Sequence, residues 1–166
     1  YPLPLFGETA ISWVDWQVQG FTGLELWNGF SEFKTVTQSL PKVLFYAFFP
    51  TLIPHGPLPQ AFNKWDELLK TGKKVVAVTG SDAHALHYRK GFFKKTIFPY
   101  RYHFSSINNH LLVEKPLTGE IDEDKRMIYQ ALSRGNSFIG FDRAAPTSGF
   151  TFTAENEDAT VSMGET

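Results

Sequence analysis

The stretch Val75–Leu86, VVAVTGSDAHAL, decides the fold class predicted for this chain. It begins with a short apolar run rich in valine that ends at Gly80, which is typical of a strand buried on both faces, as in parallel sheets. A carboxylate and an imidazole, Asp82 and His84, follow at once. We therefore expect an α/β protein with polar side chains just beyond the carboxyl end of a buried strand.

Helical and extended patterns alternate on both sides of this strand. The expected order is helix 8–20, strand 21–29, helix 30–40, helix or strand 41–49, loop 51–59, helix 59–72, strand 73–80, loop 80–101, a helical turn and strand over 102–115, helix 122–135 with Asp122 as N-cap, and two or three strands over 136–165. Strands that alternate with helices favour parallel α/β units, and the tail reads as the start of an antiparallel element.

The composition excludes several classes of protein. The chain has 166 residues, enough for one domain, and its 42% hydrophobic and 20% charged residues are ordinary for a soluble globular protein. A net charge of -1 provides no overall field to attract nucleic acid or an anionic membrane, and no apolar stretch reaches the ~18 residues that span a bilayer. With no cysteine, disulfides, thiolate zinc sites and a cysteine nucleophile are excluded.

The pair Asp82 and His84 is the strongest candidate for chemistry. Side chains two residues apart in extended backbone point the same way, so the carboxylate and the imidazole are expected to converge. Carboxylate oxygen and imidazole nitrogen together suit zinc, manganese or iron. A purely structural interpretation is also open, in which Asp82 caps the next turn and His84 is a surface histidine.

Glu25 and Asn28 form a second candidate pair, in the expected strand GLELWN. A glutamate among apolar neighbours is either buried and paired or faces a site. Asn28 stands at the carboxyl end of that strand, where site residues of α/β proteins lie. The structural alternative is that Glu25 accepts backbone hydrogen bonds and Asn28 makes the turn.

The other histidines carry weaker signals. His87 stands three residues after His84, as a further ligand on a helical turn would, but its basic neighbours favour a solvated loop. No potential metal ligand stands near His55, His103 or His110 at a sequence spacing typical of metal sites. We expect these three histidines to be structural.

A basic run follows the Asp-x-His pair, with aromatic residues between its members. It contains Arg89, Lys90, Lys94, Lys95 and Arg101. Basic side chains beside a metal site can hold a phosphate group. Aromatic interleaving also occurs in proteins that bind single-stranded nucleic acid, although the near-neutral net charge disfavours that partner. A flexible solvated loop is the structural interpretation.

Several stretches, in this order, resemble the C-terminal half of the PHP (polymerase and histidinol phosphatase) family of metal-dependent phosphoesterases, in the branch of carbaryl-hydrolase-like metallohydrolases. They are GFTGLELWNGFSEFK, GKKVVAVTGSDAHAL, IFPY, SSINNHLL, IYQALSRGNSFIGFD, GFTFTA and SMGE. The resemblance covers most of the chain, from about Phe21 onward, and GSDAH is similar to the last metal motif of that family.

The resemblance implies the C-terminal part of a distorted (β/α)7 barrel over residues 1–135, and a closing strand with the start of a β-rich extension over 136–166. It also implies a cluster of divalent zinc, manganese or iron ions whose bound hydroxide attacks a small-molecule phosphoester. Asp82 and His84 match the final Asp and His ligands of the family.

The remaining candidates have supporting roles in this interpretation. Glu25, with Asn28, matches a residue that supports the ligands rather than one that binds metal. Arg89 or Arg101 would contact the phosphate of the substrate.

The sequence departs from the family in lacking its early His-x-His, further histidines and bridging glutamate. We therefore expect a fragment of a longer enzyme that by itself is inactive, holds no metal tightly and self-associates through exposed strand edges. A membrane partner is not expected, and the cellular compartment is left open. The alternative is a non-catalytic binding domain that keeps the scaffold but not the metal cluster.

Overall fold

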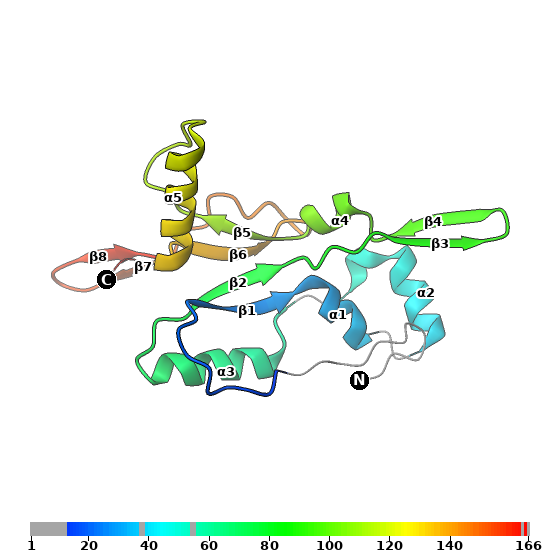
Figure 1. Cartoon of the computed structure of the whole chain (residues 1–166), viewed down its shortest axis with the longest axis horizontal. Coiled ribbons are helices and arrows are strands. Elements are labelled where there is room, and N and C mark those ends of the chain that lie inside the picture. Colours follow the sequence, from blue (N-terminus) through cyan, green and yellow to red (C-terminus); the bar gives the residue numbers. More distant parts are fainter. Residues whose placement is uncertain (1–12, 37–38, 54–55, 164, 166) are drawn as a thin grey trace.

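The structure is a computed structural model that describes residues 13–36, 39–53, 56–163 and 165. Its elements in chain order are β1 (Gly23–Asn28), α1 (Gly29–Val36), α2 (Leu40–Phe48), the 3-10 helix η1 (Pro50–Leu52), α3 (Pro59–Lys70), β2 (Val76–Gly80), β3 (Leu86–Lys90), β4 (Phe93–Ile97), α4 (Tyr100–Phe104), β5 (Ile107–Leu111), α5 (Ile121–Arg134), β6 (Ser137–Phe141), β7 (Thr153–Glu155) and β8 (Thr160–Ser162) (Figure 1).

The strands of the described residues form four separate two-stranded sheets. β1 and β2 pair in parallel, as the alternation of strands and helices predicts, whereas β3–β4, β5–β6 and β7–β8 are antiparallel pairs. The connection from β1 to β2 passes through α1, α2 and α3, which is the long helical crossover that a parallel pair needs. β6, which lies beyond the expected boundary at residue 135, pairs with β5.

The predicted part of a (β/α)7 barrel is wrong, because no barrel closes in the described residues. A parallel barrel needs a helical crossover between each strand and the next. Between β2 and β5 the chain instead forms the β3–β4 hairpin and the short helix α4, and β5 then pairs antiparallel with β6. At the edge of β2 that does not pair with β1, the side chain of Asn109 in β5 forms hydrogen bonds with the β2 backbone. No further strand pairs with β2 there in the described residues.

Three local predictions also need correction. Residues 13–20 form a turn and irregular backbone instead of the expected helix 8–20, whose first part lies outside the described residues. The expected loop 80–101 contains the β3–β4 hairpin, which turns at Gly91 with a φ of 61° that glycine adopts without strain. The N-cap of α5 is Glu120, and Asp122 lies in the first turn of the helix.

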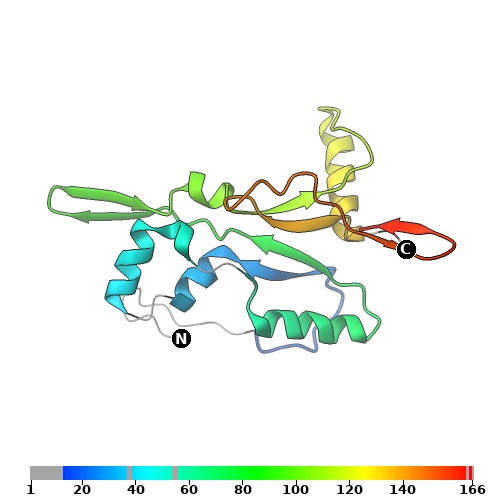
Figure 2. The same cartoon turned by 180° about the vertical axis from the view of Figure 1, so that it is seen from behind.

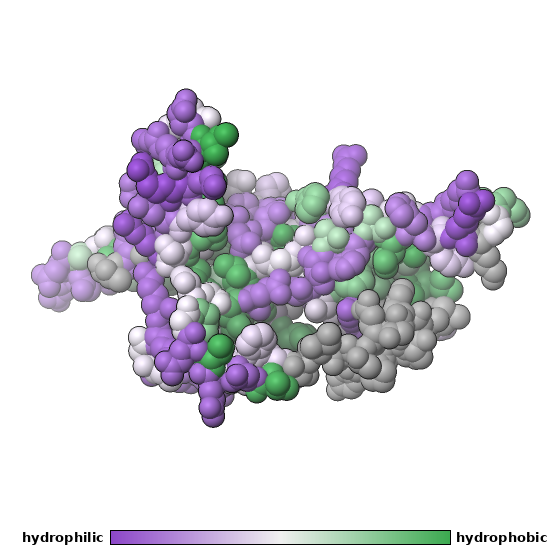
Figure 3. All heavy atoms as spheres, viewed as in Figure 1, coloured by the Kyte–Doolittle hydropathy of each residue, from purple (hydrophilic) through white to green (hydrophobic). Residues whose placement is uncertain are grey.

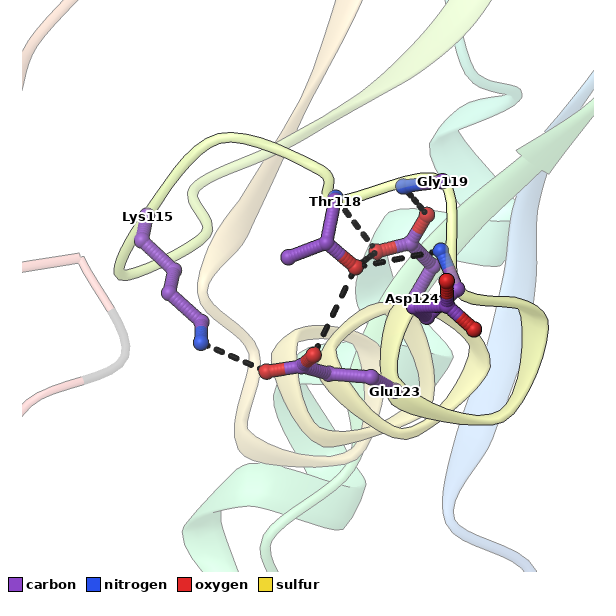
Figure 4. Close-up of polar contacts among 6 residues, drawn as sticks. Lys115, Thr118, Gly119, Glu123 and Asp124 are labelled. Carbon is purple, nitrogen blue, oxygen red and sulfur yellow. Dashed lines mark hydrogen bonds and ion pairs between the residues drawn. The ribbon is translucent and has the colours of Figure 1, made fainter.

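The start of α5 is held by side chains of its own first turns (Figure 4). Asp124 accepts hydrogen bonds from the backbone N–H groups of Thr118, at 2.8 Å, and Gly119, at 2.9 Å. Lys115 donates to Glu123 at 2.5 Å. The hydrogen bonds that Asp124 accepts, first of all that from the Thr118 backbone, lower the pKa of its carboxyl and satisfy donors that precede the helix.

The main apolar core lies between α1, α2 and the segment that leads into α4. It consists of Phe30, Phe33, Val43, Ile53, Phe98 and Tyr102. The Tyr102 hydroxyl donates to the carbonyl of Pro50 at 3.0 Å, so the start of η1 is tied to α4. None of the described helices has the length and apolar character needed to cross a bilayer.

Candidate functional site

The carboxyl ends of β1 and β2 bring the first candidates to one edge. In the parallel register Asn28 is opposite Gly80, so the segments that follow both strands begin side by side. Asn28 then starts α1, because its Oδ1 accepts a hydrogen bond from the Ser31 backbone N–H at 2.8 Å. The segment after Gly80 carries Asp82 and His84 and leads into β3.

Asp82 and His84 lie close together at this edge. Asp82 has a φ of 46°, in the left-handed region that only a few non-glycine residues adopt. The Nδ1 atom of His84 is 2.7 Å from the Asp82 carbonyl oxygen and 3.4 Å from its carboxylate Oδ1. A carbonyl only accepts, so Nδ1 carries the hydrogen, and in the neutral form of such a ring the lone pair that can bind a ligand is on Nε2.

The imidazole of His84 is held in place on one side by an aromatic ring. It stacks on Phe30 of α1, with ring centroids 4.8 Å apart. About half of the His84 side chain, 52%, remains exposed, as does 36% of the Asp82 side chain. The pair is therefore fixed by its local contacts yet reachable from solvent.

Glu25 and Asn28 contact each other beside this pair. The Asn28 side-chain amide donates to the two carboxylate oxygens of Glu25 at 3.4 and 3.3 Å. The Glu25 carboxylate lies where a side chain at Gly80 would stand, so glycine leaves it room at the end of β2. Glu25 is exposed, so it is not the buried, paired glutamate that was one of the two alternatives.

His103 lies under the same edge, although the sequence analysis assigned it only a structural role. It is 4% exposed, its Nε2 has no hydrogen-bond partner among the residues that the structure describes, and the backbone of Ser81 and His84 lies beside its ring. Burial lowers the pKa of His103, and this effect outweighs the backbone groups that favour the protonated form. No sequence signal distinguished it, because α4 brings it to the edge through tertiary packing.

A small cavity borders His103 on the side of α4. It is lined by Gly29, Ser81, Tyr102, His103, Ser106 and Ile107. A wider, open pocket of about 640 Å³ lies elsewhere, between α5 and the amino ends of β1 and β2, where Gly23 and Val76 line it. The candidates therefore gather at the opposite end of the parallel pair from that pocket.

The other predicted residues lie away from this edge. Arg89 stands in β3 opposite Lys94, and Arg101 stands on α4; both are exposed. His87 is in the hairpin, with Nδ1 3.1 Å from the Thr96 hydroxyl, so it does not extend the Asp-x-His pair on a helical turn. His55 lies outside the described residues.

The donor chemistry at this edge fits a divalent cation in part. Nε2 of His84 has no hydrogen-bond partner among the described residues, and Nδ1–H of the same ring donates to a carbonyl, which is the arrangement usual for metal-binding histidines. In the part of the chain that the structure describes, however, no three His, Asp or Glu side chains are grouped so as to hold a metal ion. Catalytic zinc sites use about three protein ligands, so these residues supply an incomplete set.

A second polar cluster, at the end of β6, was not predicted. Asp142 accepts hydrogen bonds from Asn108 and His110 of β5, both at 2.8 Å, and from the hydroxyl and backbone N–H of Thr147. The His110 ring stacks on Phe138 with centroids 4.6 Å apart. The sequence did contain one signal for this cluster, a carboxylate directly after an apolar strand. Asp82 shows the same pattern after β2.

Comparisons with known proteins identify no relative. No family model, curated protein or solved structure matches the chain.

Proposed function

We propose that this chain contributes Asp82 and His84 to the divalent metal site of a phosphoester hydrolase. The observation that carries the proposal is the His84 ring, whose Nδ1–H donates to the Asp82 carbonyl and whose Nε2 stays free at the carboxyl end of a parallel strand. The resemblance of GSDAH and its flanking stretches to metal-dependent phosphoesterases is the second support.

The residues of the chain have distinct tasks in this proposal. Asp82 and His84 bind the cation, and stacking on Phe30 limits the rotation of the imidazole. Glu25 and Asn28 hold the end of β1 beside them. When bound, a divalent metal lowers the pKa of a coordinated water and polarises a phosphoryl oxygen. The remaining ligands come from residues beyond these two.

Metal binding tests the ligand assignment directly. Calorimetric titration with Zn²⁺ is expected to show weak binding to the chain, and Asp82→Asn or His84→Ala should each reduce the affinity by more than about tenfold. His87→Ala is the matched control, because it removes an exposed imidazole three residues away that contacts Thr96. Affinities that are unchanged in both Asp82→Asn and His84→Ala refute the assignment.

Hydrolysis tests the reaction class. We expect metal-dependent cleavage of p-nitrophenyl phosphate only from a protein that holds the complete ligand set, and Asp82→Asn there should lower the rate by more than about 100-fold without unfolding the protein. Full activity of that variant would rule out the role of Asp82. Absence of both metal binding and hydrolysis in that protein would favour the non-catalytic binding domain, which keeps the scaffold but not the metal cluster.

A further inference from the structure

The charges of this chain are segregated along the sequence. Residues 83–113 contain five of the 16 lysines and arginines and none of the 17 aspartates and glutamates, so this segment carries +5 and the rest of the chain -6. The net charge of -1 hides this division. A segment with five cations and no acid attracts an anionic partner even when the whole chain is nearly neutral.

Four of these basic residues belong to the two strands of the β3–β4 hairpin. They are Arg89, Lys90, Lys94 and Lys95. Arg89 and Lys94 are directly opposite in the antiparallel register, an arrangement of like charges that destabilises a hairpin in the absence of an anion. Phe92, in the turn, is 100% exposed. The hairpin projects from the body of the molecule in both views (Figures 1 and 2).

An exposed apolar surface lies next to the hairpin. We call it the α2 apolar face; its side chains are 47–58% exposed, and it consists of Leu44, Phe45, Phe48, Phe49 and Leu52. The Nζ atom of Lys95 is 3.6 Å from the centroid of the Phe48 ring, so the hairpin and this face are in contact. In Figure 3, hydrophilic side chains gather at the outer end of the hairpin and hydrophobic ones lie beside it over α2.

We propose that the hairpin tip and the α2 apolar face together bind the surface of a bilayer that contains anionic lipids. Phenylalanine and leucine side chains enter the boundary between headgroups and acyl chains, while lysine and arginine reach back to the anionic headgroups. The charge of residues 83–113 complements that surface. The proposal is independent of the proposed hydrolase function and departs from the expectation, based on net charge, that the chain has no membrane partner.

A lipid surface accounts for more of these features than a nucleic acid does. Phosphodiester binding would use the cations of the hairpin and stack bases on exposed rings. It would leave the aliphatic side chains of the α2 apolar face, Leu44 and Leu52, uncovered. An exposed apolar patch beside basic residues is instead the composition of surfaces that lie in the membrane interface.

Sedimentation with vesicles tests the proposal. The chain is expected to bind vesicles of 70% phosphatidylcholine and 30% phosphatidylserine at 0.1 M NaCl, and to bind pure phosphatidylcholine vesicles at least about tenfold more weakly. Arg89→Glu/Lys94→Glu should lower binding to the anionic vesicles by more than about tenfold. Lys73→Glu/Lys74→Glu makes the same change of charge in an exposed stretch before β2 and should bind nearly as the natural chain does.

A site-specific probe covers the case in which the charge variant does not fold. The chain has no cysteine, so Phe92→Cys labelled with an environment-sensitive fluorophore reports on the hairpin tip alone. Its emission should shift to the blue on anionic vesicles, and that of labelled Lys73→Cys should not. Absence of sedimentation, equal binding to both kinds of vesicle, an unshifted tip probe or tighter binding to single-stranded DNA would each overturn the proposal.

Discussion

At the scale of single residues, Asp142 has an extensive set of polar contacts. It accepts from Asn108, His110 and both donor groups of Thr147, and it joins β5, β6 and the segment after β6. These hydrogen bonds, led by that of the Thr147 hydroxyl, hold the pKa of the Asp142 carboxyl far below its usual range. The carboxylate is therefore a stabilising contact whose effect depends on its charge.

We expect Asp142→Asn to lower the free energy of unfolding by about 2 kcal/mol at pH 7, because donors now bonded to a carboxylate lose their charged acceptor. The folded-state pKa of Asp142 is lowered, so its stabilisation is complete above the unfolded pKa of about 4 and is lost as pH falls toward the folded pKa. Urea unfolding of both proteins at pH 7 and at pH 3 measures the difference, which should shrink at the lower pH.

Asp158→Asn is the control for this prediction, since Asp158 lies in the exposed turn between β7 and β8. It should change the free energy of unfolding little at either pH. A difference between natural chain and Asp142→Asn that stays constant down to pH 3 would contradict the assigned cause.

At the scale of elements, a single side chain connects two of the sheets. The Oδ1 atom of Asn109 in β5 accepts from the Thr79 backbone N–H at 2.9 Å, and its Nδ2 donates to the Thr79 carbonyl at 2.8 Å. The Asn109 amide thus bonds to both the backbone N–H and the backbone carbonyl of Thr79, in the place of a neighbouring strand. The Thr79 hydroxyl, in turn, donates to the Trp27 carbonyl in β1 at 2.6 Å.

Asn109→Ala is expected to destabilise the protein by about 2–3 kcal/mol, because it leaves two backbone groups of the buried Thr79 without partners. Asn156→Ala provides the matched comparison. The Asn156 side chain also accepts hydrogen bonds from two backbone N–H groups, those of Asp158 and Ala159, but it lies in an exposed turn. Chemical denaturation should show a clearly larger loss for Asn109→Ala, and equal losses would show that the link between the sheets adds no stability.

At the scale of the whole molecule, the strands are distributed over small separate sheets. Within the described residues each strand pairs with one other strand, which leaves a second edge without a strand partner. β3–β4 and β7–β8 extend from opposite ends of the molecule (Figure 1). Unpaired edges are templates for pairing between chains, and isolated two-stranded sheets are marginally stable in water.

We therefore expect self-association in solution through strand edges. Light scattering coupled to size exclusion should give a mass that rises with concentration above the 18.8 kDa of one chain. Phe45→Ser/Phe48→Ser alters the α2 apolar face and leaves every strand residue unchanged, so association through edges should persist in this variant. A constant mass of one chain over the accessible concentrations would disprove the expectation, and loss of association in the variant would assign it to the α2 apolar face.

Sequence patterns could predict part of the candidate site. The strand that ends at Gly80 and the position of Asp82 and His84 beyond it could be predicted, because both depend on residues adjacent in the chain. The contribution of His103 could not, because it reaches the same edge from α4, about twenty residues later. The basic run was identified in sequence, but its hairpin geometry depends on the pairing of β3 with β4.

The sequence by itself determined the strands β1 and β2, the helices α3 and α5 and the strand-rich tail, because periodicity, glycine stops and apolar runs act over a few residues. Only the tertiary structure decided which strands pair, and hence that the sheets stay separate instead of forming a barrel. Strand pairing joins residues far apart in the chain, so its outcome depends on the packing of all the elements together.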